Sequence, residues 1–188
     1  IYAFARTADD LADELQDAVA LAAFRADFLR HQVADASGER STDIALFTDL
    51  RLTIEECQLE QSLFTDLLDA FDQDCHQRRY DRAQLIDYCR RSADPIGRLV
   101  LRVSGYHDAR LDAYSDRICT GLQLLNHLQD LREDLLERDR IYFPLEELAA
   151  CGASEADLRA AKASPGVQRF VLEQAERIAR EFAAGWPL

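Results

Sequence analysis

The stretch "YAFARTADDLAD", residues 2–13, decides how this chain folds, because it combines a helical pattern with closely spaced acids. On a helix of about 3.6 residues per turn, steps of four, three and four place these residues on one stripe: Tyr2, Arg6, Asp9 and Asp13. Asp10 lies beside the stripe. Neighbouring carboxylates repel each other, more strongly in a cavity unless a cation joins them. For this stretch taken alone, a solvated acidic face is the simpler interpretation.

A second cluster lies in "GLQLLNHLQDLRED", residues 121–134. Asn126, Asp130 and Asp134 follow at steps of four, so one face of a helix should carry all three. Oxygen ligands from two helices suit Mg²⁺, which takes one or two carboxylates per ion and completes its shell with phosphate oxygens and water. The two clusters therefore suggest a diphosphate held between facing helices by several Mg²⁺ ions.

The stretch "RDRIYFP", residues 138–144, follows the second cluster. Arg140 and Tyr142 could donate to diphosphate oxygens, as Arg6 and Tyr2 could from the first helix. For Arg140 taken alone, a surface position is the simpler interpretation.

A di-iron helical bundle is the rival interpretation of carboxylates in a helical core. It requires Glu-x-x-His motifs, and none of the four histidines has a glutamate three residues before it. His127 lies beside the ligand stripe rather than on it. We expect His127 to be packed or hydrogen-bonded, not to bind a metal.

Composition limits the class of protein. The 188 residues, 48% of them hydrophobic, suffice for a single domain over residues 1–188. Only 7 Gly and 4 Pro occur, which predicts an all-α fold. A net charge of -13 would repel a polyanion, so we expect no nucleic-acid partner. The five cysteines form no C-x-x-C motif, which favours reduced thiols in the cytoplasm.

The ends and the apolar runs of the chain lead to two further expectations. The longest strictly apolar run, residues 18–24, is far shorter than the roughly 20 residues of a membrane-spanning helix. The chain starts at Ile1 with no methionine and no visible signal peptide, so we expect a fragment that is incomplete at both ends.

Periodicity predicts the helices of the first half. It runs from residue 1 to about residue 33 and ends in a surface loop around Gly38. Residues 43–57 and 60–75 should form two amphipathic helices that pack as a hairpin.

In the second half, a helix over residues 82–104 should kink or break at Pro95. Residues 111–137 give the longest uninterrupted helical pattern. Pro144 should start a short helix that Gly152 closes, and Ser154 and Ser164 should cap the last two helices.

Two glycines, Gly97 and Gly121, lie within helical patterns at a cost of roughly 1 kcal/mol each relative to alanine. Something should therefore approach the backbone closely at these positions. Close helix packing and the wall of a substrate tunnel are both open.

Two long motifs, "YAFARTADDLAD" and "NHLQDLREDLLERDRIYFP", stand in this order about 110 residues apart. In these motifs the chain resembles the squalene/phytoene synthase family, and the similarity covers most of residues 1–185. The resemblance implies an all-α isoprenoid-synthase bundle. It implies that five residues hold Mg²⁺, the four acids among them being catalytic: Asp9, Asp13, Asn126, Asp130 and Asp134. It also places four residues near the diphosphate: Tyr2, Arg6, Arg140 and Tyr142.

Further features point to one branch of the family. "SADPIGRLVL", "SDRICTGLQLLN" and Gln129, where phytoene synthases usually carry arginine, resemble the members that convert presqualene diphosphate to hydroxysqualene. This branch implies no nicotinamide cofactor, and its greasy substrate suggests peripheral membrane contact. Synthases that condense two prenyl diphosphates into presqualene diphosphate or phytoene remain an alternative, as does a non-catalytic helical relative. In two places the chain departs from the family: the glycine before Arg140 is missing, and His127 replaces an aromatic or aliphatic residue.

Overall fold

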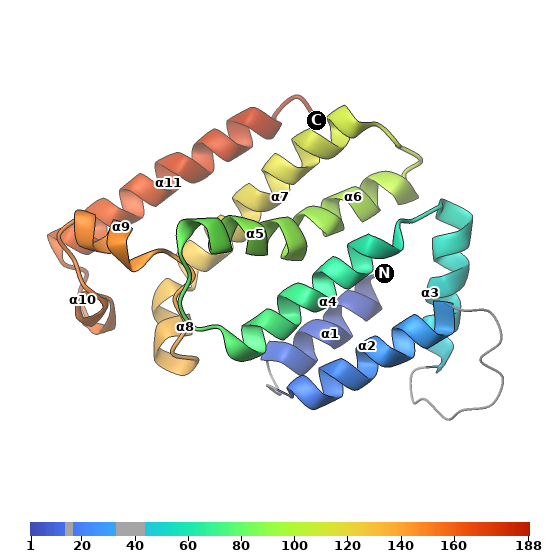
Figure 1. Ribbon diagram of the computed structural model, residues 1–188. Coiled ribbons are helices and arrows are strands. Elements are labelled where there is room, and N and C mark those ends of the chain that lie inside the picture. The colour runs from blue at the N-terminus through green and yellow to red at the C-terminus, as the bar shows by residue number, and fades with distance from the viewer. Residues whose placement is uncertain (14–16, 33–43) are drawn as a thin grey trace.

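The computed structural model describes residues 1–13, 17–32 and 44–188, and in this part of the chain every regular element larger than a single β-bridge is an α-helix (Figure 1). The predicted all-α class is confirmed. The helices have these bounds: α1 Tyr2–Asp13, α2 Ala18–Gln32, α3 Ile44–Cys57, α4 Gln61–His76, α5 Arg82–Ser92, α6 Asp94–Val103, α7 Ala109–Gln129, α8 Leu131–Glu137, α9 Leu145–Ala150, α10 Glu155–Arg159 and α11 Pro165–Gly185.

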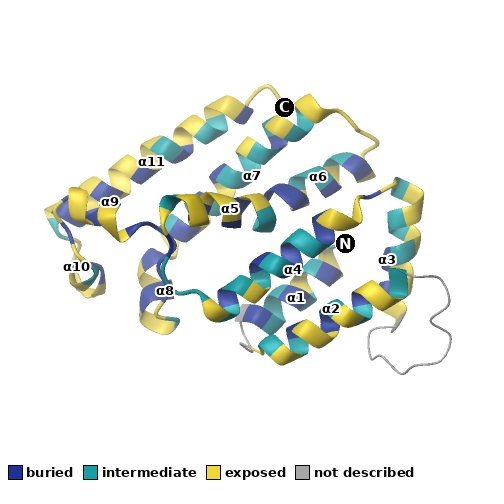
Figure 2. Ribbon diagram, viewed as in Figure 1, coloured by how far each residue is buried: buried dark blue, intermediate teal, exposed yellow. Residues whose placement is uncertain are grey.

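Two buried clusters hold the bundle together, and the inward faces of the helices are the buried ones (Figure 2). In the first cluster, α1 to α4 pack around phenylalanines, with the rings of Phe4 and Phe64 meeting edge to face at 5.4 Å. Aromatic pairs of this geometry add to the area that they bury. The second cluster joins α5 and α7 to α11 through leucines and tyrosines such as Leu85 and Tyr88. Because each cluster packs its own group of helices, α1 and α4 lie opposite α5, α7 and α8.

The N-terminal half differs from the sequence prediction in two places. The periodic stretch from residue 1 to 33 is two helices, because the side chain of Asp17 accepts a hydrogen bond from the backbone nitrogen of Ala20 at 2.9 Å and caps α2. The predicted hairpin of α3 and α4 is also wrong. Gln58 adopts a left-handed φ of 52°, and this sharp turn lets α4 pack against α1 and α2, while α3 packs against α2. The predicted loop around Gly38 lies outside the described residues.

The break predicted near Pro95 is confirmed, since α5 ends at Ser92 and α6 starts at Asp94 with the proline in its first turn. The uninterrupted helix predicted over residues 111–137 is wrong. Asp130, with φ of -92° and ψ of 0°, separates α7 from α8. The bend turns Leu131 and Leu135 into the second buried cluster, and this burial outweighs helix continuity.

Several local predictions are confirmed. Helix α9 follows Pro144 and ends before Gly152, whose φ is 77°, and Ser154 and Ser164 cap α10 and α11. Both helical glycines prove to be sites of close helix packing. Gly97 of α6 lies against Ser115 and Cys119 of α7, and Gly121 of α7 lies against Phe182 of α11. Among the described residues, no helix combines the length and apolarity needed to cross a bilayer.

Candidate active site

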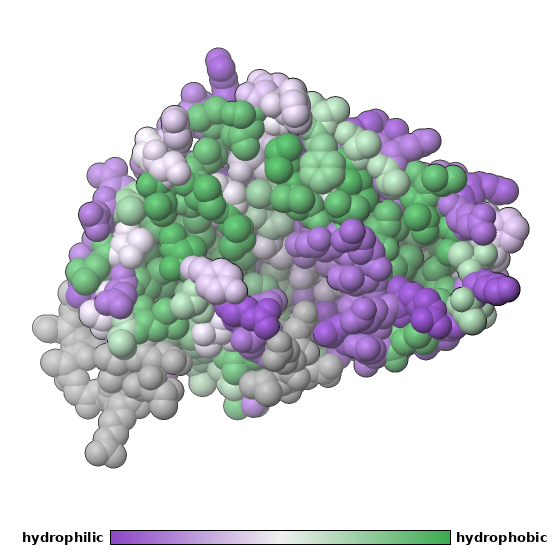
Figure 3. Space-filling view, turned by 180° about the vertical axis from the view of Figure 1, so that it is seen from behind, coloured by the Kyte–Doolittle hydropathy of each residue, from purple (hydrophilic) through white to green (hydrophobic). Residues whose placement is uncertain are grey.

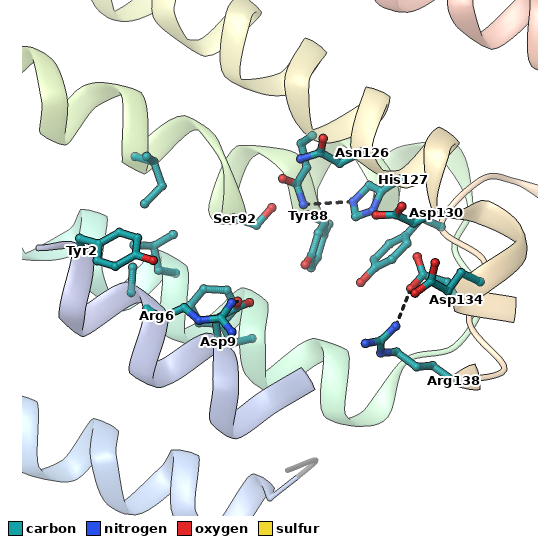
Figure 4. A pocket seen from close by; sticks show the side chains of 17 residues that line it. Tyr2, Arg6, Asp9, Tyr88, Ser92, Asn126, His127, Asp130, Asp134 and Arg138 are labelled. Atoms are coloured by element: carbon teal, nitrogen blue, oxygen red, sulfur yellow. Dashed lines mark hydrogen bonds and ion pairs between the residues drawn. The ribbon is translucent and has the colours of Figure 1, made fainter. Parts of the chain in front are cut away.

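A cavity of about 720 Å³ lies between α1 and α4 on one side and α5 to α8 on the other (Figure 4). Charged and polar side chains line it together with the apolar side chains of Leu67, Phe71 and Ile96. The cavity can therefore hold a ligand with a charged head and an apolar body.

From α1, three of the four predicted stripe residues line the cavity: Tyr2, Arg6 and Asp9. The guanidinium of Arg6 donates to Asp9 at 3.4 Å and pairs with Asp10 at 2.7 Å. One cation thus offsets the repulsion between two neighbouring acids. Asp13 is the last residue of α1, and its side chain lies outside the described residues.

From the opposite side, Asn126, Asp130 and Asp134 face the α1 residues across the cavity (Figure 4). Although α7 ends before Asp130, the backbone nitrogens of Asp130 and Asp134 still bond the carbonyls four residues earlier, at 2.9 and 2.8 Å. This helical spacing keeps the three side chains on one side. Asp134 is nearly buried and accepts a hydrogen bond from Arg138 at 3.2 Å. The two predicted clusters therefore meet at one cavity.

The side chains that face this cavity suit Mg²⁺ in kind, since they are carboxylate and amide oxygens from α1 on one side and from α7 and α8 on the other. In the described part of the chain, no three His, Cys, Asp or Glu side chains gather closely enough to hold an ion by themselves. Mg²⁺ takes only one or two carboxylates per ion and completes its shell with phosphate oxygens and water. The residues present therefore fit ions that bridge the protein to a bound diphosphate.

The segment after α8 places Arg140 and Tyr142. Asp139 adopts a left-handed φ of 50°, which aspartate tolerates better than most residues. The chain can therefore turn here without the glycine that the family resemblance led us to expect before Arg140. Ile141 then bridges to Arg79, so that Arg140 and Tyr142, two residues apart in extended backbone, point to the same side.

Arg140 is 1% exposed, so the interpretation of it as a surface residue is wrong. Its guanidinium donates to the hydroxyl of Tyr142 at 2.8 Å and to the backbone carbonyl of Asp74 at 2.9 Å. Tyr142 lines the cavity, whereas Arg140 lies behind it. Arg138, which the sequence analysis did not single out, lines the cavity.

A buried network that was not predicted from the sequence lies behind the cavity wall, centred on Asp74 of α4. Tyr80 and Tyr142 donate to Asp74 Oδ1 at 3.0 and 2.9 Å, and Tyr88 donates to Oδ2 at 2.5 Å. Burial, followed by the charge of Asp74, raises the pKa of Tyr88 well above its ordinary value, so this hydroxyl keeps its proton. No shared spacing links these residues, so no local pattern could have revealed the network.

His127 is packed and hydrogen-bonded, as predicted. Its ring stacks on Tyr142 at 3.6 Å between centroids, and its Nε2 lies 3.2 Å from the amide nitrogen of Gln123. Burial, and then the charge of Arg140, lower the pKa of His127 to about 3. The imidazole is therefore neutral near pH 7.

An all-α bundle with carboxylate and amide side chains facing each other across a part-apolar cavity has the architecture of an isoprenoid synthase. The chain belongs to the squalene/phytoene synthase family, whose model matches residues 1–188.

Relatives with curated names support this membership. The chain is 39% identical over 164 residues to a hydroxysqualene synthase of Sinorhizobium fredii, covering 87% of this chain and 54% of the relative. It is 37% identical over 189 residues to a hydroxysqualene synthase of Rhodopseudomonas palustris, covering 100% of this chain and 63% of the relative. Presqualene diphosphate and phytoene synthases also match. The chain thus spans between half and two thirds of the length of these two hydroxysqualene synthases.

The fold matches a solved structure as well. The crystal structure of squalene synthase HpnC from Alicyclobacillus acidocaldarius superposes with a TM-score of 0.83 at 38% identity, covering 98% of this chain and 68% of the other. The predicted isoprenoid-synthase bundle is therefore confirmed.

Proposed function

We propose that the protein containing this chain is a Mg²⁺-dependent synthase that converts presqualene diphosphate to hydroxysqualene and releases diphosphate. The observation that carries the proposal is that the acids of α1 face Asn126, Asp130 and Asp134 of the α7–α8 segment across one cavity. Similarity to two hydroxysqualene synthases favours this branch of the family.

Five residues would hold the metal in this proposal: Asp9, Asp13, Asn126, Asp130 and Asp134. Bound Mg²⁺ supplies positive charge that stabilises the diphosphate as it leaves. This would account for the clustering of acids on α1 and on the α7–α8 segment.

The other polar residues of the cavity would orient the diphosphate. Arg6 offers charge-assisted hydrogen bonds to phosphate oxygens from α1, and Arg138 can do the same from the end of α8. Tyr2 would add a hydroxyl group from α1, whereas the hydroxyl of Tyr142 already donates to Asp74, so Tyr142 would contribute its ring to the wall of the site. Arg140 would act from behind the cavity wall, where its hydrogen bond holds Tyr142 in place.

The apolar part of the cavity would receive the hydrocarbon. Leu67 and Phe71 of α4 and Ile96 of α6 offer no hydrogen bonds to water. They would therefore keep bulk water from a carbocation while it rearranges. No nicotinamide is required, because the capture of a cation by water transfers no hydride.

A peripheral membrane contact of a cytoplasmic enzyme completes the proposal, since the substrate is a lipid. A broad hydrophobic area on the face seen in Figure 3 supports it.

The alternative is a synthase that joins two prenyl diphosphates, and the matches to presqualene diphosphate and phytoene synthases favour it. A non-catalytic helical protein is less well supported, because four described ligand residues still face one cavity: Asp9, Asn126, Asp130 and Asp134.

The test uses the complete protein with Mg²⁺ and presqualene diphosphate, without nicotinamide, and identifies the product by mass spectrometry. Hydroxysqualene is expected. Asp130→Asn should abolish turnover, whereas Asp139→Asn should retain it, because Asp139 lies outside the cavity and pairs with Arg79 and Arg159 on the surface. Condensation of farnesyl or geranylgeranyl diphosphate, with presqualene diphosphate left unchanged, would support the alternative instead.

A further inference from the structure

Asp74 lies behind the aromatic wall of the cavity, is 3% exposed, and does not line the cavity itself. Three tyrosine hydroxyls donate to its two carboxylate oxygens, and one of them, Tyr88, reaches Oδ2 at 2.5 Å. Tyr88 is also a lining residue, lying between the α1 side chains and His127 (Figure 4). Tyr88 therefore connects the cavity to a buried carboxylate.

The direction of this hydrogen bond determines what Tyr88 can offer a ligand. A phenolic hydroxyl has one proton, and Tyr88 gives it to Asp74. Toward the cavity, its oxygen can then act only as an acceptor. Burial and the charge of Asp74 raise the pKa of Tyr88, which keeps the hydroxyl protonated and the direction fixed.

We propose that Asp74 acts through Tyr88 to position and deprotonate the water that captures the carbocation, an inference that rests on the proposed function. Water would donate one hydrogen bond to the Tyr88 oxygen and direct a lone pair at the cation. As the new carbon–oxygen bond forms from that lone pair, one water proton moves to Tyr88 and the Tyr88 proton moves to Asp74 Oδ2. The products are a neutral alcohol and a protonated Asp74, so the charge of the cation and that of the carboxylate cancel.

The surroundings of Asp74 agree with this role. A protonated alcohol is a far stronger acid than a carboxylic acid, so the transfer runs downhill even though Arg140 lies 3.7 Å from Asp74 Oδ1. The acceptor is also oriented before the cation forms, because Asp74 and the packing around Tyr88 hold the hydroxyl in place. Preoriented dipoles of this kind stabilise charge without reorganising during the reaction. In this scheme Tyr88 is the catalytic residue and Asp74 the positioning residue.

Tyr80 supplies a matched control. It donates to the same carboxylate at 3.0 Å, but it does not line the cavity. Tyr80→Phe removes one hydrogen bond from Asp74 and leaves the cavity wall as it is. A purely structural role of the network would make Tyr80 and Tyr88 equivalent.

The experiment compares Asp74→Asn, Tyr88→Phe and Tyr80→Phe in the complete protein with Mg²⁺ and presqualene diphosphate. It measures diphosphate released and the hydroxysqualene formed per diphosphate. We expect this ratio to fall about tenfold in Asp74→Asn and Tyr88→Phe, the scale of one lost hydrogen bond to a charged group, with olefins from proton loss making up the difference. Tyr80→Phe should keep the wild-type ratio.

The outcomes separate this inference from the proposed function. A wild-type protein that forms no hydroxysqualene refutes the proposed function. A wild-type protein that forms it, together with an unchanged ratio in Tyr88→Phe, refutes the role of Asp74 and Tyr88 alone. An equal fall in Tyr80→Phe also overturns the inference, because it shows a structural effect. Should Asp74→Asn fail to fold, Tyr88→Phe decides, since it keeps the aromatic ring in the core.

Discussion

Arg140→Met should destabilise the protein strongly, because Arg140 is the buried cation beside Asp74. The side chain is 1% exposed and donates to Tyr142 at 2.8 Å and to the Asp74 carbonyl at 2.9 Å. Methionine fills much of the same volume but provides neither donor nor charge. The carboxylate of Asp74, 3.7 Å from the guanidinium, would then remain buried without this cation.

The magnitude follows from this loss. Removing one partner of a buried ion pair typically costs about 3–5 kcal/mol. Three tyrosine hydroxyls would still donate to Asp74, so we expect about 3 kcal/mol, the lower end of that range. Arg138→Met is the matched control. Its side chain is 27% exposed and pairs with Asp134 at 3.2 Å, so its loss should cost about 0–1 kcal/mol.

Urea unfolding of the complete protein, followed by circular dichroism, measures both free energies of unfolding. A double variant, Arg140→Met with Asp74→Asn, tests the cause, because neutralising Asp74 removes the unpaired charge. The double variant should lose less free energy of unfolding than the two single variants lose in sum. Equal, small losses in Arg140→Met and Arg138→Met would refute the reasoning.

Three further predictions concern the metal, the helix packing and the response to pH. Mg²⁺ with inorganic diphosphate should raise the melting temperature of the complete protein by mass action and should no longer do so in Asp130→Asn; an unshifted wild type would contradict the metal site. Gly97→Ala should lower the free energy of unfolding in urea by about 1–3 kcal/mol, because the new Cβ would lie 2.2 Å from the Oγ of Ser115. Gly121→Ala should lower it less, because the closest contact of its Cβ would be 3.0 Å. Burial raises the pKa of Asp94 from 3.8 to about 7, so its protonated form stabilises the fold at low pH, and this contribution is lost as pH rises through 7. Melting curves from pH 5 to 8 should show that loss in the wild type and less of it in Asp94→Asn.

Much of the site could be predicted because it depends on local geometry. Residues three or four apart on a helix share a face whatever the helix packs against, so Arg6 with Asp9, and Asn126 with Asp130, could be grouped from spacing alone. The caps of α10 and α11 were predictable for the same reason, since a capping serine bonds groups three residues further on: Ser154 Oγ donates to Asp157 Oδ2, and Ser164 Oγ accepts from the backbone nitrogen of Val167.

Other features depended on contacts between distant residues. The bend at Asp130 reflects the burial of Leu131 and Leu135, which periodicity does not reveal. The helices α3 and α4 were both predicted, but their packing was not. The turn at Gln58 lets α4 pack against α1 instead of against α3.

From the sequence alone we could predict the helical class of the protein and the helix faces that carry the clustered acids, because both follow from interactions within one or two helical turns. Only the three-dimensional packing shows that Asp74 accepts a hydrogen bond from the hydroxyl of Tyr142, 68 residues away, and that Arg140 is buried rather than exposed. A buried polar side chain must find its partner wherever packing puts one, and packing depends on the whole chain.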